Sequence, residues 1–139
     1  MKYIDSCVFI GAYFPDDPNH KVSIEFIEKL NKGEFTGVIS IFGLSEIGGF
    51  ISRNSNPEKA QEFVIELLKL PNLHISYAIN FTEFMNSVLM VSIAKGLSGA
   101  DSIHFIHAIS SIEVDEFITL DNDFNKVSTH IKVINLRKQ

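Results

Sequence analysis

Short apolar segments typical of β-strands alternate with longer helix-forming segments along the chain, and this alternation restricts the fold most. Strands are predicted at residues 2–4, 35–39, 73–75, 117–120 and 132–135. Helices are predicted at residues 6–14, 20–30, 41–53, 58–70 and 80–95, then in a segment headed by Asp101, and finally from Asn122. Strands that alternate with helices in this way form a parallel sheet covered on both faces. The prediction is therefore an α/β fold with a short central parallel sheet flanked by helices.

The stretch Leu97–Phe124 places two carboxylates where buried elements meet an opening. Its helical segment carries apolar residues with the spacing i, i+3, i+4, i+7, namely Phe105, Ala108, Ile109 and Ile112. Asp101 lies one turn earlier on that same stripe, and Asp121 directly follows the apolar run FITL. An unpartnered buried carboxylate is very costly, so each acid needs a cap, a cation or a metal ion.

Each acid also has a purely structural interpretation. Ser98 and Asp101 fit a capping box, and Asp121 fits an N-cap of the helix that follows it. Asp5 fits the N-cap of the helix after the first strand, and Glu46 fits an ordinary helix-surface position. These alternatives stay open when the acids are considered one at a time.

The predicted topology brings the acids to one edge of the sheet. Asp5 ends the first strand and Asp121 ends the fourth, whereas Glu46 and Asp101 lie in helices next to strand ends. Ligands of open parallel sheets gather at the carboxyl ends of the strands. Glu46 is also flanked by apolar residues (Leu44, Ile47 and Phe50), which argues against a plain surface role. One shared site explains the four positions better than four coincidences.

The donor atoms of this site favour a hard divalent cation. An all-oxygen pocket suits Mg²⁺ or Mn²⁺, whereas zinc prefers histidine or cysteine. The five histidines show no ligand spacing; His104 and His107 form an i, i+3 pair that is expected to pack or to border the groove. The glycines of the helix at 41–53 (Gly43, Gly48 and Gly49) are poor helix formers and indicate close approach by another backbone or a ligand. The chemistry this favours is metal-assisted phosphodiester hydrolysis.

Composition supports one domain and removes an electrostatic objection to a nucleic-acid partner. The net charge is −5, but apart from Asp5, Glu46, Asp101, Asp121 and Asp123 the 12 remaining acids equal the 12 basic residues. The negative surplus therefore belongs to the candidate site, where bound cations would cancel much of it. A chain of 139 residues forms a single domain of ordinary size, expected to span residues 1–139. No apolar run has membrane-spanning length, no signal peptide is evident, and the single cysteine, Cys7, indicates a reducing cytoplasm.

The acids and their contexts resemble a known family. Asp5 in YIDSCVFI, Glu46 in LSEI, Asp101 in LSGADSIHFIHAI and Asp121 in FITLDNDF together resemble a PIN domain from end to end, most closely the small VapC-type ribonuclease toxins. The resemblance implies a three-layer α/β/α fold and Mg²⁺- or Mn²⁺-dependent cleavage of single-stranded RNA. It implies that Asp5, Glu46, Asp101 and Asp121 bind metal, with Asp123 auxiliary and with the hydroxyls of Ser6 and Thr119 in support. It also implies a homodimer and a small antitoxin partner. The segment SIHFIHAI is bulkier than is common in the family, which bears on groove shape and RNA preference.

Other functions remain to be weighed against this resemblance. A phosphoacceptor receiver domain needs an acid after its third strand, and none follows the strand near Ile75. A haloacid-dehalogenase-like phosphatase needs Asp-x-Asp, but Cys7 occupies the second acidic position. The remaining alternative is a non-catalytic PIN-like module that binds RNA or protein through an inactive acidic site. Two partner hypotheses accompany the nuclease function: dimerisation through the amphipathic helices at 58–70 and 80–95, and an antitoxin that places Arg or Lys near Asp5 and Asp101.

Overall fold

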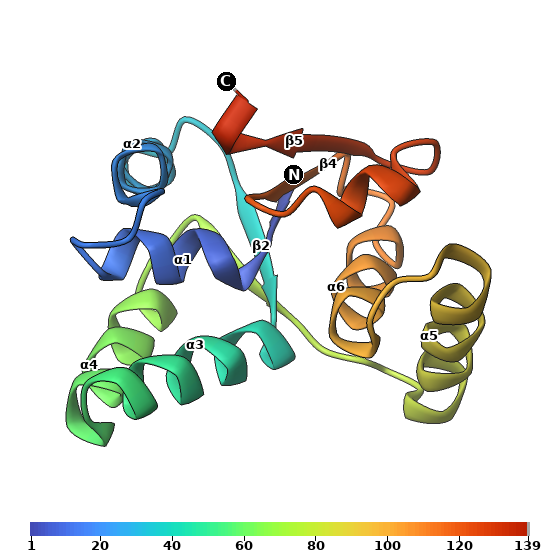
Figure 1. Ribbon diagram of the computed structural model, residues 1–139, viewed down its shortest axis with the longest axis horizontal. Helices are drawn as coiled ribbons and strands as arrows, with labels where there is room; N and C mark the ends of the chain where they lie inside the picture. Colours follow the sequence, from blue (N-terminus) through green and yellow to red (C-terminus); the bar gives the residue numbers. More distant parts are fainter. Residues whose placement is uncertain (139) are drawn as a thin grey trace.

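The computed structural model describes residues 1–138 and contains a five-stranded parallel sheet with the strand order β3-β2-β1-β4-β5 (Figure 1). The strands are β1 (Lys2–Ile4), β2 (Gly37–Ser40), β3 (Leu73–Ser76), β4 (Glu116–Thr119) and β5 (Lys132–Asn135). The helices are α1 (Ser6–Tyr13), α2 (His20–Asn31), α3 (Ile41–Asn54), α4 (Pro57–Leu68), α5 (Phe81–Lys95) and α6 (Gly99–Ile109), with 3₁₀ turns η1 (Asp123–Val127) and η2 (Leu136–Lys138). None of the helices in this part of the chain is both long enough and apolar enough to span a bilayer.

The strands divide their side chains between two apolar cores, because successive residues of a strand point to opposite faces. Ile4, Ile39 and Ile118 belong to the core that is completed by α1, α2, α3 and α4. The preceding residue of each strand (Tyr3, Val38 and Phe117) belongs to the core that is completed by α5, α6 and η1. Figure 1 shows these two groups of helices on opposite sides of the sheet. The predicted three-layer α/β/α fold is confirmed.

The sheet has a topological switch point between β1 and β4. The chain runs from β1 outward to β2 and β3, then returns to place β4 on the other side of β1. The register pairs Ile4 with Ile118, and the Asp5 amide donates to the Ile118 carbonyl over 2.9 Å. Asp5 and Thr119 therefore lie side by side at the carboxyl ends of neighbouring strands, where open α/β sheets bind their ligands.

Most predicted boundaries shift by one or two residues, and the structure departs further from the predictions at three places. The strand predicted at residues 35–39 runs from Gly37 to Ser40, because Phe35 packs against Phe26, with ring centroids 4.8 Å apart, before the ladder begins. The segment predicted to be helical from Asn122 is the 3₁₀ turn η1. Ile109 and Ile112, predicted on a buried helical stripe, are 43% and 98% exposed, because α6 ends at Ile109 and Ile112 lies beyond it.

Candidate metal-binding active site

Asp5 is a buried carboxylate held by hydroxyl and thiol donors. The hydroxyl of Thr119 donates to its Oδ2 over 2.7 Å, and the Cys7 thiol donates to the same oxygen over 3.1 Å. Thr119 also accepts the backbone N–H of Asp121 over 2.9 Å, so one hydroxyl orients both acids at the switch point. Asp5 occupies the N-cap position of α1, yet its side chain makes no capping hydrogen bond. Asp5 therefore has the N-cap position that the structural interpretation gives it, but its carboxylate does not cap α1.

Glu46 is held by one residue of α1 and one residue of α6. The Ser6 hydroxyl donates to its Oε1 over 2.9 Å, and Nε2 of His104 forms a hydrogen bond with the same oxygen. His104 is in turn fixed by the hydroxyl of Tyr3, 2.8 Å from Nδ1. Its Nε2 also lies 3.7 Å from Oδ1 of Asp5. The imidazole thus bridges the two carboxylates, and Glu46 is not an ordinary surface residue.

Asp101, Asp121 and Asp123 form a second group of acids next to Asp5. Each offers a carboxylate oxygen, and these oxygens all lie within 4.8 Å of one another. The Ser98 hydroxyl accepts the N–H of Asp101 over 3.0 Å and so fixes the first turn of α6. The carboxylate of Asp121 accepts the N–H of Asp123 over 2.9 Å. Ser98 caps α6 as predicted, whereas the N-cap of η1 is Asn122 rather than Asp121.

The acids repel one another, and the pKa of Asp101 records that repulsion. Burial raises the pKa of this carboxyl, the charges of Asp5 and Asp121 raise it further, and Ser98 and His104 partly counteract them. For His104, burial opposes protonation, but the hydrogen bond with Glu46 and the charge of Asp5 outweigh burial and raise its pKa. Burial and the charge of Asp5 also raise the pKa of the Cys7 thiol, so Cys7 remains a neutral donor.

The structure thus divides the predicted site residues into two connected groups. Asp101, Asp121 and Asp123 share one cluster of oxygens, whereas Asp5 and Glu46 are turned toward donors and lie outside that cluster. Ser6 and Thr119, predicted as supporting hydroxyls, each contact a predicted acid.

Sequence reasoning missed the contact between His104 and Glu46. His104 and His107 are both buried, but only His104 reaches the acids, while Nδ1 of His107 pairs with the Ser76 hydroxyl over 2.9 Å. The available signal was the position of His104 one turn after Asp101, which places both side chains on one face of α6.

The donor set fits a divalent cation. Three carboxylates with oxygens this close need compensating charge, and the cluster is half-open, with Asp101 and Asp121 partly buried and Asp123 exposed. Oxygen-only ligands with room for water suit Mg²⁺ or Mn²⁺ better than zinc. Asp101, Asp121 and Asp123 could bind such an ion directly, and Asp5 lies one hydrogen-bonded step away through Thr119.

Comparison with known proteins points to one family. A sequence model of the PIN domain matches residues 2–129. No curated protein matches the sequence. The fold is similar to a chain of VapBC2 from Rickettsia felis, solved bound to a promoter DNA fragment (TM-score 0.70, 22% identity, 97% of this chain and 98% of that chain). It is also similar to VapC20 of Mycobacterium tuberculosis, described as a toxin that cleaves the sarcin-ricin loop (TM-score 0.69, 10% identity, 97% of this chain and 99% of that chain). A third similar structure is FitAcB of Neisseria gonorrhoeae (TM-score 0.68, 14% identity, 100% of both chains).

Proposed function

The chain belongs to the PIN domain family, and on this premise we propose that it is a divalent-metal-dependent endoribonuclease, the toxin of a toxin–antitoxin pair. The observation that carries the proposal is the cluster of Asp101, Asp121 and Asp123 oxygens within 4.8 Å of one another, next to Asp5 at the switch point of the sheet. When bound there, Mg²⁺ or Mn²⁺ lowers the pKa of water and stabilises charge on a phosphate.

The protein's own residues would then position the substrate and the attacking water. Asp101, Asp121 and Asp123 would hold the cation, and the Thr119 hydroxyl, which donates to Asp5 and accepts the N–H of Asp121, would keep these two acids in place. Glu46 and Asp5 accept hydrogen bonds and both lie beside the His104 imidazole, which suits them to orient water for attack on a phosphodiester. Ser6 and His104 fix the Glu46 carboxylate, so that it presents a defined edge to the substrate.

Cleavage of single-stranded RNA with Mn²⁺ and with EDTA tests the proposal. Wild type should cleave only with Mn²⁺, and Asp101→Asn should lose nearly all cleavage, because the change removes a ligand charge and keeps the side-chain shape. Glu62→Gln on the exposed outer face of α4 removes one carboxylate charge away from the site and should cleave normally. If wild type binds RNA but leaves it intact with Mn²⁺, the chain is instead a non-catalytic PIN-like module.

Two protein partners accompany this function. We propose that an antitoxin lays an amphipathic segment over the acidic opening and places Arg or Lys beside Asp5 and Asp101, because a crowded acidic pocket attracts cations. A cognate partner that binds an Asp5→Ala, Asp101→Ala variant as tightly as wild type, at low and at high salt, would contradict this idea.

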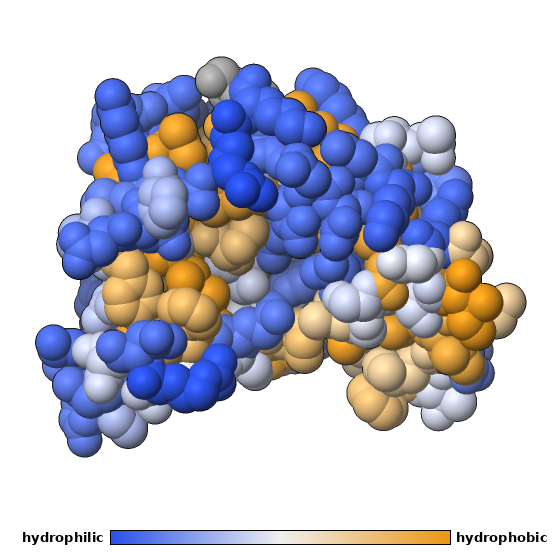
Figure 2. Space-filling model, viewed as in Figure 1, coloured by the Kyte–Doolittle hydropathy of each residue, from blue (hydrophilic) through white to orange (hydrophobic). Residues whose placement is uncertain are grey.

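We also propose a homodimer that uses α5. The exposed apolar residues of this helix are Phe81, Leu89, Met90 and Ile93, each more than half exposed. Figure 2 shows apolar groups gathered over α5, at the right-hand side of the view. Isologous pairing of two copies would cover this surface, as is usual in small homo-oligomers.

A further inference from the structure

The only two arginines of the chain, Arg53 and Arg137, line two hollows that adjoin the acidic site. One hollow, of about 370 Å³, has Cys7, Asp121 and Arg137 in its wall. The other, of about 350 Å³, has Ser6, Glu46 and Arg53. Ile10 and Phe50 line both hollows and so form the apolar floor between them. Figure 2 shows an apolar area between α1 and α3, with hydrophilic groups on either side of it.

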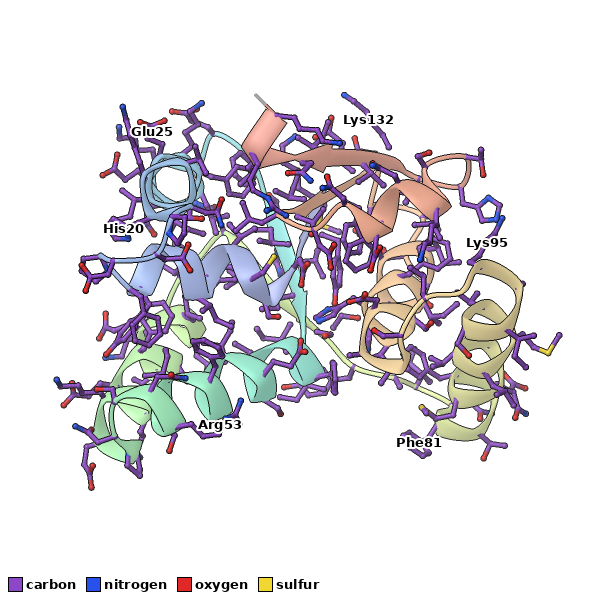
Figure 3. All side chains as sticks on the ribbon, in the orientation of Figure 1. His20, Glu25, Arg53, Phe81, Lys95 and Lys132 are labelled. Atoms are coloured by element: carbon purple, nitrogen blue, oxygen red, sulfur yellow. The ribbon has the colours of Figure 1, made fainter. Side chains whose placement is uncertain are left out.

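The wall that α3 contributes is a regular stripe. Glu46, Gly49, Phe50 and Arg53 have the spacing i, i+3, i+4, i+7 and therefore share one face of the helix. Arg53 lies about 10 Å along the helix axis from Glu46. A Cβ atom at Gly49 would lie 3.1 Å from the Arg53 guanidinium, so the glycine makes room for Arg53 to fold back along the helix toward the site. Figure 3 labels Arg53 on α3.

Arg137 is held on the other side by the end of the sheet. The Asn135 side chain accepts the N–H of Arg137 over 3.0 Å and donates to Asn122 over 3.1 Å. These bonds fix η2 against the segment that carries Asp121. Leu136 is buried in the core, so the residue directly before Arg137 also anchors the turn.

The two guanidinium groups are available for an anionic ligand. Within residues 1–138, neither forms an ion pair with a carboxylate. The acids that share their hollows already accept hydrogen bonds: Asp17 from the N–H of Asn19, Asp121 from that of Asp123, and Glu46 from Ser6. Phe50, 37% exposed, lines both hollows, each of which has one of the arginines in its wall.

We propose that Arg53 and Arg137 bind backbone phosphates of a single-stranded RNA on either side of the scissile position, and that one base stacks on Phe50. The proposal rests on the nuclease function proposed above and adds the path of the substrate. Two unpaired cations around an exposed aromatic ring are the features with which proteins bind single strands. An antitoxin segment would be a competing occupant, but arginines complement phosphate, whereas the antitoxin proposed above supplies cations itself.

Binding of a random-sequence 12-nucleotide RNA tests the path separately from cleavage. Fluorescence anisotropy is measured in Ca²⁺ without Mg²⁺ or Mn²⁺, over a range of salt concentrations. For Arg53→Gln and for Arg137→Gln, the slope of log Kd against log salt should fall in magnitude by about 0.7 each, and by about 1.4 for the double variant. Lys59→Gln, which removes the same charge from the exposed face of α4, should leave the slope unchanged.

Phe50 gives a second, independent signature. Phe50→Leu should weaken binding at least about fivefold without changing the salt slope, and Phe50→Tyr should restore it, because stacking needs a ring rather than apolar bulk. The ring also packs against Phe14, with centroids 5.7 Å apart, so melting temperatures are compared to exclude unfolding.

Three outcomes would overturn the inference. Unchanged slopes and affinities in variants of a protein that cleaves RNA with Mn²⁺ would overturn the path and leave the nuclease function standing. Arginine variants that lose a cognate protein partner but keep RNA binding would assign the hollows to that partner. A wild type that neither binds nor cleaves RNA would overturn the path together with the proposed function.

Discussion

Thr119 shows how one buried residue can hold a site together. Its hydroxyl donates to Asp5 and accepts from the backbone of Asp121, and the side chain is fully buried. A hydroxyl after an apolar strand and before an acid can be identified in the sequence. Its double role requires β1 and β4 to be neighbours, because only then does Asp5 lie opposite Thr119.

Thr119→Val should destabilise the metal-free protein by about 1–3 kcal/mol, because the isosteric change removes one hydrogen bond from the buried Asp5 carboxylate and one from the Asp121 N–H. The melting temperature should fall by roughly 3–10 °C. Thr119→Ser keeps the hydroxyl, so its melting temperature should fall much less. A valine variant that melts like wild type would show that the hydroxyl does not support these acids.

His104 marks the limit of sequence reasoning at this scale. Asp5, Glu46, Asp101 and Asp121 follow from strand ends and from their apolar neighbours. The contacts of His104 with Tyr3 and Glu46 join α6, β1 and α3, and such long-range pairing leaves no local pattern. Spacing alone also could not separate His104 from His107, which faces Ser76.

His107 predicts a loss of stability in mild acid. Burial, together with the charge of His104, lowers its pKa to about 4. In the unfolded chain, His107 takes up a proton near pH 6.5, whereas in the folded protein it stays neutral until about pH 4. The folded state is therefore destabilised relative to the unfolded state as the pH decreases from about 6.5 to 4.

Between pH 7 and pH 5, protonation of His107 in the unfolded chain should lower the free energy of unfolding by about 1 kcal/mol. This is less than the pKa shift alone would give, because the ring borders an open hollow where solvent screens its charge. His107→Gln keeps a partner for Ser76 and should melt with a shallower pH dependence than wild type over this range. His104 is present in both proteins, so its opposite effect largely cancels. If the melting temperatures of wild type and His107→Gln change equally with pH over this range, His107 has an ordinary pKa in the folded protein.

Among the elements, those that position the site were the most predictable. β1, α3 and α6 lie within a few residues of their predicted bounds, because strong apolar periodicity and caps such as Ser98 define them. The glycines of α3 were expected to allow close approach by another backbone or a ligand, but their neighbours are side chains. A Cβ atom at Gly43 would lie 3.2 Å from His104 and one at Gly49 would lie 3.1 Å from Arg53, whereas one at Gly48 would make only an ordinary contact with Val64 of α4. The shift of β2 to residues 37–40 was not predictable, since pairing with β1 and β3 selects which apolar residues enter the ladder.

The exposed face of α5 predicts association at the element scale. Leu89→Lys combined with Ile93→Lys should convert the proposed dimer into a monomer, because two cations would face their copies across an isologous interface. Both side chains are exposed, so the melting temperature of the monomer should fall only through the loss of association. Light scattering from micromolar to millimolar protein measures this. A wild type that stays monomeric throughout would contradict the dimer.

For the whole molecule, the topology explains why the negative charge gathers at one place. β4 returns beside β1, so Asp5 and Asp121 come from distant parts of the chain to the same hydroxyl, that of Thr119, and α6 adds Asp101 beside Asp121. The alternation of strands and helices predicted the parallel sheet, but it did not specify the strand order. The division of the acids into the oxygen cluster of Asp101, Asp121 and Asp123 and the pair next to His104, Asp5 and Glu46, depends on that strand order and on side-chain packing.

Crowded acids oppose folding unless a cation binds. Like charges about 4 Å apart repel by roughly 4 kcal/mol at an effective dielectric of 20. Asp101→Asn removes one of these charges, so the metal-free variant should be at least as stable as wild type. If Asp101 served only as a residue of the capping box, asparagine would cost a few tenths of a kcal/mol and leave the metal response intact.

The most direct test of the metal site is the melting temperature of wild type and Asp101→Asn with and without Mn²⁺. A cation at 100 times its Kd stabilises the native state by about 2.7 kcal/mol, so wild type should melt roughly 5–10 °C higher with saturating Mn²⁺. Asp101→Asn should melt at or above wild type without metal and lose most of the shift with it. A variant that keeps the full Mn²⁺ shift, or a wild type that shows none at millimolar Mn²⁺, would contradict a metal site built on Asp101, Asp121 and Asp123.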